Sequence, residues 1–420
     1  LMQDQVFFFL YRNIKAVQLY SDQTSERQQE ILTNLFANQY QLLYISPERL
    51  NQPAIQALFA RGTVRLLVVD EAHCASTWGH DFRPEYQKIK QIRTQFPHIP
   101  CVGLTATATL QTQQDIIEKL YLQDPIVYRD SFDRPNIFLK AQECKEPQKK
   151  SELLNYMVGQ KGQRGIVYAR SRKTVESTAQ TLRNAGFRAA YYHAGMSPSD
   201  KKIVLQAFLR GEVPIVCATV AFGMGIDSSD VRFVVHMDLQ ENLERYYQEI
   251  GRAVRDGAYS KALLLFSELD QKKIEYLQEK KGSNTLKNTQ KLKLAVHYAV
   301  TPLCKRQVLL AYFDEPSSGN CSACQSCVAS SYGANHREPT HSAFIINQSS
   351  PQTLPISLSH EQVVYICSQI ACGNDSLPIV IQLSSQKFRI VPGNVERQLS
   401  ELKTKGILSS VPSDQRTLRL

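Results

Sequence analysis

Two adjacent acidic residues, Asp70 and Glu71, end an apolar run, and the loop after them carries the only tryptophan of the chain. The stretch Val68–Tyr86 reads VVDEAHCASTWGHDFRPEY. In an open parallel sheet, ligands bind at the carboxyl ends of the strands. There, one carboxylate can hold Mg²⁺ through its water shell, and a second can orient a water molecule against a terminal phosphate. Taken alone, an Asp-Glu pair more often caps the next helix, so the rest of the chain must decide.

The loop after these acids combines aromatic and charged side chains. Trp78 and Phe82 lie among His80, Asp81 and Arg83. An aromatic ring can stack on any base, and this contact is worth about 1–3 kcal/mol per base. The loop therefore indicates a contact with an unpaired polynucleotide next to the acids.

Four of the ten cysteines form a second group that could do chemistry. Cys304, Cys321, Cys324 and Cys327 follow the pattern C-x16-C-x2-C-x2-C. Such a run brings three thiolates to one ion, and a fourth completes the tetrahedron that Zn²⁺ prefers. An iron–sulfur cluster is the alternative, although its common spacing ends in C-x3-C-P, which this chain lacks. The competing ligands are His297, His336 and His341.

Composition excludes some classes and favours others. The chain has 420 residues, of which 43% are hydrophobic and 21% charged, values typical of globular protein. No run of about 18 apolar residues occurs, so a membrane-spanning helix is not expected. The formal charge of +10 favours a polyanionic partner such as nucleic acid. The other cysteines are scattered in apolar surroundings, which favours a reducing cytoplasm over a secreted disulfide framework.

Apolar runs alternate with helical patterns through the first two thirds of the chain. The runs at 41–46, 64–72, 101–107, 164–170, 213–219, 231–237 and 261–266 predict buried strands. Helices are predicted between them, for example over 25–38 and 174–185. Continuous apolar strands separated by helices predict parallel sheets covered on both faces. Residues 133–150 lose this periodicity and are expected to connect two α/β lobes.

The acidic segment closely resembles motif II and the aromatic-rich loop of the RecQ-type DNA helicases, a superfamily 2 group. Further segments match that family in order and spacing over roughly residues 1–330: SPERL (46–50), GLTATAT (103–109), SFDRPNI (131–137), GIVYARSRKTVE (165–176), YYHAGMS (191–197), ATVAFGMGID (218–227) and YYQEIGRAVRDG (246–257). Several such motifs in one chain are specific. A DEAH box alone would also allow an RNA helicase, but the tryptophan loop and the four cysteines argue against it.

The resemblance implies roles for individual residues. Asp70 would be the Mg²⁺-associated carboxylate, and Glu71 would polarise the attacking water. His73 would link the nucleotide site to Thr105 and Thr107. The residues expected to contact DNA are Trp78, His80, Phe82, Arg83, Thr105, Arg170, His193 and Thr219.

Motif VI of the family is represented by Gln248, Arg252 and Arg255, which are expected to act at the nucleotide, with both arginines reaching the phosphates as arginine fingers. Gly225 and Asp227 are further expected nucleotide contacts. Arginines three residues apart usually lie on a solvated helix face, and only the full motif set favours the catalytic reading. The chain departs from the family at Val254, where glycine is usual, and in GIDSSD, where GINKPD is usual.

The resemblance also implies a domain order. An α/β fold of two RecA-like parallel-sheet lobes is expected over 1–140, with the first lobe incomplete, and 141–272. A helical zinc-binding subdomain over 273–330, a linker over 331–355 and a winged helix over 356–420 should follow. No G-x-x-x-x-G-K-[ST] occurs in the chain, so the first lobe should lack its phosphate loop and a central strand, with neighbouring strands left unpaired. We expect an N-terminal truncation rather than a degenerate relative.

The expected function is that of an ATP-dependent 3′–5′ DNA helicase in recombination and repair, with ATP, Mg²⁺ and Zn²⁺ as cofactors. Expected partners are single-stranded DNA, duplex junctions, a single-stranded-DNA-binding protein and other repair proteins, and no membrane. We expect a monomer in the bacterial cytoplasm, associated with the nucleoid. The alternative is a DNA-binding scaffold of the same fold without ATPase activity, because the Walker A motif is absent from this chain.

Overall fold

The computed structural model divides the chain into two compact units, which are described separately. Unit 1 comprises Leu1–Asp130 and Pro351–Leu420, and unit 2 comprises Ser131–Ser350. The structure describes residues 6–7, 9–20, 23–79, 81–223, 228, 230–254, 256–280, 285–317, 319–332 and 379–383.

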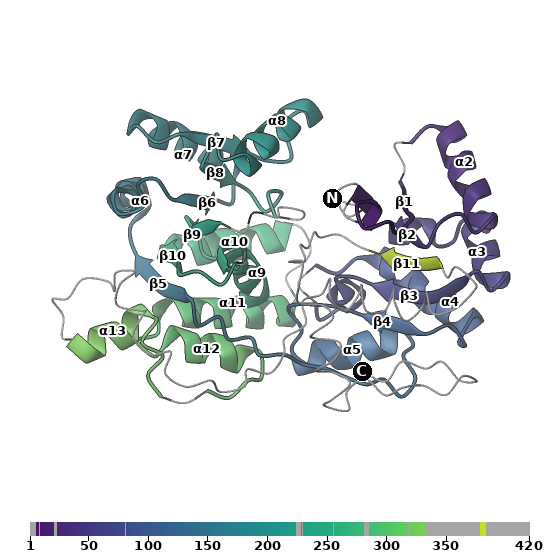
Figure 1. Ribbon diagram of the computed structural model, residues 1–420. Coiled ribbons are helices and arrows are strands. Elements are labelled where there is room, and N and C mark those ends of the chain that lie inside the picture. Colours follow the sequence, from purple (N-terminus) through teal and green to yellow (C-terminus); the bar gives the residue numbers. More distant parts are fainter. Residues whose placement is uncertain are drawn as a thin grey trace, which may run out of the picture. The chain divides into compact units, whose positions relative to one another are not determined.

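Unit 1 is built on a parallel sheet with the strand order β1-β2-β11-β3-β4 (Figure 1). The strands are β1 (Ala16–Leu19), β2 (Leu42–Ile45), β3 (Val64–Val69), β4 (Cys101–Gly103) and β11 (Ile379–Leu383). The helices are α2 (Ser25–Phe36), α3 (Pro53–Ala60), α4 (Gln87–Gln95) and α5 (Leu110–Lys119). Three short 3₁₀ helices are η1 (Pro47–Arg49), η2 (Ala72–Ala75) and η3 (Pro84–Tyr86).

Both faces of this sheet are buried, as its continuous apolar strands predict. Along β3, Leu67 and Val69 belong to one core cluster, whereas Leu66 and Val68 belong to another. Because successive side chains of a strand point to opposite faces, the two clusters cover the two sides of the sheet.

Strand β11 was not predicted. It pairs in parallel with both β2 and β3, with Val380 opposite Leu42 and Leu66. The expectation that the strands beside the missing central strand stay unpaired is therefore wrong, because the backbone of β11 pairs with them. β11 lies in the segment expected to form a winged helix, and the other residues of 356–420 lie outside the described residues.

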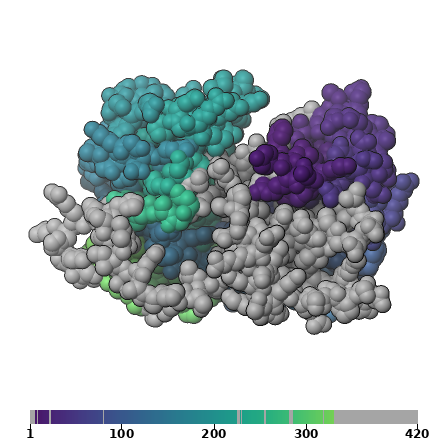
Figure 2. Space-filling view, viewed as in Figure 1, coloured from purple at the N-terminus to yellow at the C-terminus, as the bar shows by residue number. Residues whose placement is uncertain are grey.

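Unit 2 contains a second parallel sheet, with the strand order β5-β10-β9-β6-β8-β7. The strands are β5 (Ile137–Glu143), β6 (Arg164–Tyr168), β7 (Ala189–Tyr192), β8 (Ile215–Ala218), β9 (Val231–His236) and β10 (Ser260–Phe266). The helical segments between them are η4 (Glu146–Gln148), α6 (Lys149–Val158), α7 (Arg172–Asn184), α8 (Pro198–Leu209), α9 (Leu243–Ile250) and η5 (Gly251–Val254). Helices α7 and α8 lie by β7 (Figure 1), and the space-filling view shows both on the surface of the unit (Figure 2).

Four further helices follow the second sheet within the same unit. They are α10 (Glu268–Lys280), α11 (Leu286–Val300), α12 (Lys305–Tyr312) and α13 (Gln325–Tyr332). Helices α11, α12 and α13 all contact the edge strand β5. The Lys305 ammonium group lies under the end of α11, where it donates to the carbonyl oxygens of Tyr298, Ala299 and Thr301 at 2.7–2.9 Å. Burial lowers the pKa of Lys305 to about 8.

The predicted strands are confirmed at β2, β3, β4, β6, β8, β9 and β10. The prediction of an irregular connection over 133–150 is wrong for residues 137–143, which form β5 and pair in parallel with β10. The chain thus passes into the second unit after Asp130, earlier than the expected boundary at 140. Among the described helices, none has the length and apolar character that a bilayer crossing requires.

Candidate functional site

The acidic pair lies where β3 ends, at the carboxyl edge of the first sheet. Asp70 and Glu71 are 1% and 4% exposed. Glu71 adopts the left-handed conformation, with φ 48° and ψ 45°, which is costly for a residue other than glycine. Hydrogen bonds hold the turn: the Glu71 N–H donates to Asp70 Oδ1 (2.8 Å), and the Tyr86 hydroxyl donates to the Asp70 carbonyl oxygen (3.1 Å). A backbone held in such a conformation by its surroundings is common at functional sites.

His73 joins this turn to the strand-end segment after β4. Its Nδ1 lies 3.1 Å from Thr105 Oγ1 and 3.2 Å from Glu71 Oε2, and its Nε2 lies 3.7 Å from Cys74 Sγ. Burial lowers the pKa of His73, but the hydrogen bonds with Cys74 and Glu71 outweigh it and raise the pKa to about 10. His73 thus contacts Thr105, one of the two threonines to which it is predicted to link the nucleotide site. Thr107 lies one step further, with its N–H 3.4 Å from Thr105 Oγ1.

The aromatic loop is anchored on helix α5. Asp115 accepts hydrogen bonds from the Ser76 hydroxyl (2.6 Å) and the Thr77 N–H (3.0 Å). The Trp78 N–H in turn donates to Ser76 Oγ at 3.0 Å. Nothing in the sequence marked Asp115 for this task, because the contact spans 39 residues of chain.

The side chains that this loop presents remain accessible. Trp78 is 36% and Phe82 37% exposed. The Arg83 guanidinium pairs with Asp81 at 2.7 Å, and the Arg83 N–H donates to the Cys74 carbonyl oxygen at 2.9 Å. His80 lies outside the described residues.

Three of the predicted DNA contacts follow neighbouring strands of the second sheet. Arg170, His193 and Thr219 come shortly after β6, β7 and β8, which are adjacent in the strand order. Arg170 donates to the Leu239 carbonyl oxygen (2.5 Å) and to Glu241 Oε1 (3.1 Å). His193 Nε2 lies 2.9 Å from Glu176 Oε1, and its ring stacks on Tyr191 with 5.6 Å between centroids. The parallel sheet thus brings the three residues to one edge.

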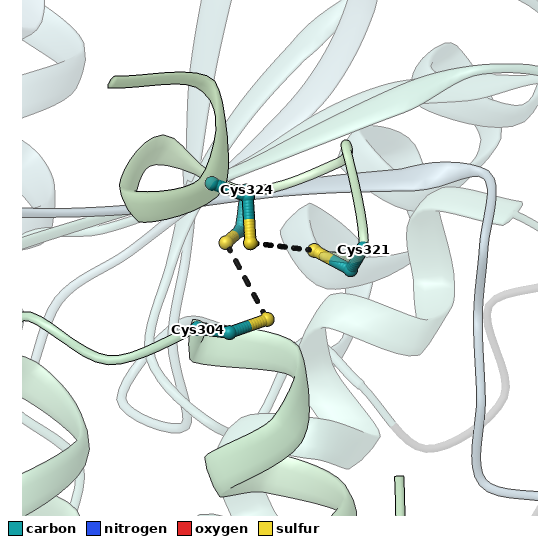
Figure 3. A group of neighbouring side chains, drawn as sticks. Cys304, Cys321 and Cys324 are labelled. Atoms are coloured by element: carbon teal, nitrogen blue, oxygen red, sulfur yellow. Dashed lines mark hydrogen bonds between the residues drawn. The ribbon is translucent and has the colours of Figure 1, made fainter. Parts of the chain in front are cut away.

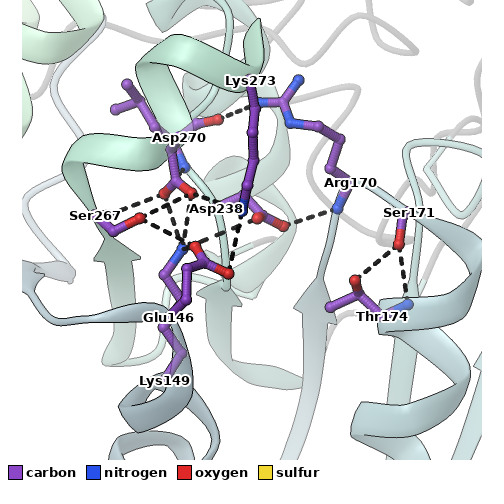
Figure 4. A network of polar contacts seen from close by, with 10 residues as sticks. Glu146, Lys149, Arg170, Ser171, Thr174, Asp238, Ser267, Asp270 and Lys273 are labelled. Atoms are coloured by element: carbon purple, nitrogen blue, oxygen red, sulfur yellow. Dashed lines mark hydrogen bonds and ion pairs between the residues drawn. The ribbon is translucent and has the colours of Figure 1, made fainter.

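A buried ionic network holds the backbone of Arg170 (Figure 4). Its N–H donates to Asp238 Oδ2 at 2.9 Å, and Asp238 lies 3.9 Å from the Lys149 ammonium group. Lys149 bonds to both Asp270 oxygens at 2.9 Å and to Glu146 at 2.7 Å. Glu146, Asp238 and Asp270 lie close enough together to hold a cation, but the ammonium group already lies among them. This network joins the ends of β5, β6, β9 and β10, and no sequence motif predicted it.

The motif VI residues lie on and after α9. Arg252 is buried and donates to the Gly223 carbonyl oxygen in the segment after β8. A Cβ at Gly223 would lie 2.8 Å from the guanidinium, so Arg252 packs directly on that backbone. Gln248 lies in α9, and Arg255, Gly225 and Asp227 lie outside the described residues.

The four cysteines come together as predicted. Their sulfur atoms all lie within 4.8 Å of one another, with Cys321 and Cys327 at 3.7 Å and Cys304 and Cys324 at 3.8 Å. A tetrahedron of Zn–S bonds of about 2.3 Å places its sulfurs about 3.8 Å apart, so the donor set fits zinc. Cys304 at the start of α12 points toward Cys321 and Cys324 (Figure 3). The hydrogen bond with Cys321 lowers the pKa of Cys324 to about 4, which favours the thiolate that a metal binds.

Comparisons with known proteins agree with this arrangement. The model of the DEAD/DEAH box helicase domain matches residues 2–116, that of the helicase conserved C-terminal domain 148–257, and that of the RecQ zinc-binding region 268–328. The ATP-dependent DNA helicase RecQ of Pasteurella multocida is 43% identical over 330 residues, which cover 78% of this chain and 52% of that protein. The chain belongs to the RecQ family of helicases. RecQ of Haemophilus influenzae is 42% identical over 330 residues (78% and 53%), and the ATP-dependent helicase SGS1 of Saccharomyces cerevisiae 38% over 407 residues (90% and 27%).

The chain spans about half the length of the bacterial RecQ proteins it matches. Within the RecQ family, its two parallel sheets are the two RecA-like lobes, as expected. The match to the RecQ zinc-binding region includes all four cysteines, which favours zinc over an iron–sulfur cluster.

Proposed function

We propose that the protein containing this chain is an ATP-dependent DNA helicase that moves 3′ to 5′ and acts in recombination and repair. Its substrates are single-stranded DNA and duplex junctions, and it acts as a monomer together with a single-stranded-DNA-binding protein and other repair proteins. A place in the bacterial cytoplasm, associated with the nucleoid, follows from this substrate and stays a prediction.

One observation carries the proposal: the acidic turn and the exposed aromatic loop belong to a single short segment. Asp70 and Glu71 are buried at the end of β3, whereas Trp78, seven residues beyond Glu71, is 36% exposed. Carboxylates at a strand end suit phosphate chemistry, and an accessible indole suits an unpaired base. Their closeness in the chain supports a device that couples DNA contact to ATP hydrolysis.

The donor set at the acidic turn fits Mg²⁺, because Asp70 and Glu71 offer the hard oxygen ligands it prefers. Bound with ATP, this ion would neutralise charge that develops on the phosphates. Asp70 would hold it through water, and Glu71 would orient the attacking water molecule. The contacts of His73 with Glu71 and Thr105 orient these groups, and Arg252 and Arg255 stay predicted phosphate contacts.

DNA-stimulated ATP hydrolysis by the full-length protein tests the proposal. Trp78→Ala removes one stacking contact of about 1–3 kcal/mol, so the DNA concentration for half-maximal stimulation should rise roughly 5- to 150-fold. The matched control is Tyr276→Ala on α10, which removes a 62% exposed ring and should behave as the wild type. A Trp78→Ala protein with unchanged DNA dependence contradicts the coupling.

Two further measurements separate the alternatives. Full-length protein that binds DNA but hydrolyses no ATP would be the scaffold rather than the helicase. Duplexes with either a 3′ or a 5′ single-stranded tail report polarity, and unwinding of only the 3′-tailed duplex is expected. Competition between DNA and RNA oligonucleotides should favour DNA.

A further inference from the structure

The first residues of unit 2 are held by helix α12 and the turn that follows it. Glu315 accepts two hydrogen bonds from this segment, one from the Ser131 hydroxyl (2.6 Å) and one from the Phe132 N–H (2.7 Å). These residues follow directly on Asp130, the last residue of the first part of unit 1. Glu315 therefore fixes the point at which the chain enters unit 2.

Phe132 lies in an aromatic cluster with two distant residues. Its ring stacks on Phe313, with 4.3 Å between centroids and 7° between planes. It meets Tyr247 of α9 edge-on at 5.8 Å, and Tyr247 and Phe313 lie 4.9 Å apart. The Tyr247 hydroxyl donates to the Phe132 carbonyl oxygen at 2.9 Å and accepts from Arg134 Nε at 3.1 Å. The entry segment is thus bonded to α9, the helix that leads into Arg252.

Arg306, two residues after Cys304, binds the next part of this segment. Its guanidinium donates to Asp133 Oδ1 (2.5 Å), to the Arg134 carbonyl oxygen (2.6 Å) and to the Ile137 carbonyl oxygen (2.7 Å). Arg306 is 5% exposed, so these three hydrogen bonds lie inside the protein.

The cysteine-bearing loop then continues along the edge of β5 that faces away from β10. The Leu139 N–H donates to the Ala323 carbonyl oxygen at 3.1 Å, and Leu139 forms a parallel bridge with Cys324. The Ala141 N–H donates to the Gln325 side chain at 3.3 Å. Residues 304–332 are here called the cysteine module, which includes the turn at Glu315. This module therefore contacts the chain from Ser131 to Ala141.

We propose that the cysteine module is a positioning element for the entry segment 131–137 and for α9. Zinc bound by the four thiolates would fix the loop that pairs with β5. Arg306, Phe313 and Glu315 of the same module then hold the entry segment in place through their contacts with it. Through Phe132 and Tyr247 the order reaches α9. The consequence for ATP turnover rests on the proposed function, whereas the effect on local order does not.

Hydrogen exchange of the full-length, zinc-loaded protein tests this proposal. Glu315→Gln keeps the side-chain shape but weakens two hydrogen bonds to a charged acceptor. We expect amides of 131–143 and of α9 to exchange roughly tenfold faster or more, while the zinc content stays unchanged. The matched control is Glu279→Gln, an exposed acid on α10, which should exchange as the wild type. Ser131→Ala, which removes one hydroxyl from an exposed residue, should produce a smaller effect in the same segment.

Removal of zinc from the wild type by a chelator is the second arm. The entry segment, β5 and α9 should exchange faster, while the inner strands β6 and β9 keep their protection. Acceleration confined to 304–332 overturns the proposal, and so does a Glu315→Gln protein that exchanges as the control. A full-length protein without ATPase activity would refute the proposed function but leave these exchange rates readable. With activity present, Glu315→Gln should lower kcat with little change in the half-saturating DNA concentration.

Discussion

Lys149→Met tests how far unit 2 depends on one buried ammonium group. Lys149 is 4% exposed and lies 2.9 Å from both oxygens of Asp270, which is 1% exposed. Asp270 also accepts hydrogen bonds from the N–H groups of Leu239 (3.2 Å) and Ser267 (3.0 Å), so it cannot leave the site without breaking them. The variant would leave three carboxylates facing one another with only the half-exposed Lys273 nearby, 3.2 Å from Glu146 and 4.0 Å from Asp270.

The expected magnitude follows from these distances. Opposite charges 2.9 Å apart attract by about 6 kcal/mol at an effective dielectric constant of about 20, before the cost of desolvation. Removing one member of a buried pair typically costs about 3–5 kcal/mol, because the remaining charge stays unpaired. For a unit of this size, that loss lowers Tm by roughly 6–20 °C.

The pKa of Asp270 determines how the stability loss of Lys149→Met changes with pH. Burial raises the pKa of Asp270 even with Lys149 present, and the loss of Lys149 should raise this pKa further. A carboxyl with a raised folded pKa destabilises the fold above that pKa and not below it, so the penalty should be largest at neutral pH and shrink on acidification.

Thermal and urea unfolding of Lys149→Met at neutral and acidic pH measure this penalty. Lys273→Met is the matched control, because Lys273 contacts Glu146 at 3.2 Å but is 46% exposed. The control should lose less than about 1 kcal/mol. Equal losses in the two variants, or a Lys149→Met penalty that does not change with pH, would refute the reasoning.

Two further variants probe the separate lobes. His73→Asn should lower the free energy of unfolding most near pH 6, by on the order of a few kcal/mol. The pKa of His73 is raised to about 10, so the stabilisation by its charged form disappears as the pH rises toward 10. Urea unfolding measures this, and a difference from the wild type that does not change over this pH range would contradict the charged His73–Glu71 pair. Gly165→Ala should lower the free energy of unfolding by about 1–3 kcal/mol or more, because its Cβ would overlap the fully buried ring of Phe233. A lower Tm is the expected result, and an unchanged Tm would show that this ring can move.

The strands that are buried on both faces could be predicted from the sequence, because each of them is an unbroken apolar run. β3 and β9 are such cases: β9 ends one residue and β3 three residues before the predicted run does. β5 was missed because its sequence, IFLKAQE, alternates with polar residues after its apolar start. It lies at a sheet edge that other parts of the chain cover, so no continuous apolar pattern is required of it.

Some residues of the candidate site could likewise be predicted from the sequence, and others could not. Spacing brought out the four cysteines and the acidic turn, because ligands of one ion or one phosphate group follow short motifs. The network around Lys149 escaped notice because Lys149 and Asp270 are 121 residues apart and each member resembles an ordinary surface charge. Burial and pairing across the ends of four strands become visible only in the folded chain.

The acidic turn and the aromatic loop are also connected through the backbone. Gly79, next to Trp78, packs so closely on His73 that a Cβ at this position would overlap the His73 carbonyl oxygen. A shift of Trp78 along a stacked base would therefore press on the residue that contacts both Glu71 and Thr105. Asp115 holds the start of the loop through Ser76 and Thr77, so the described residues between Trp78 and the carboxylates form a short, hydrogen-bonded path. This close packing, together with the aromatic ring, supports the proposed coupling between base stacking and phosphate chemistry.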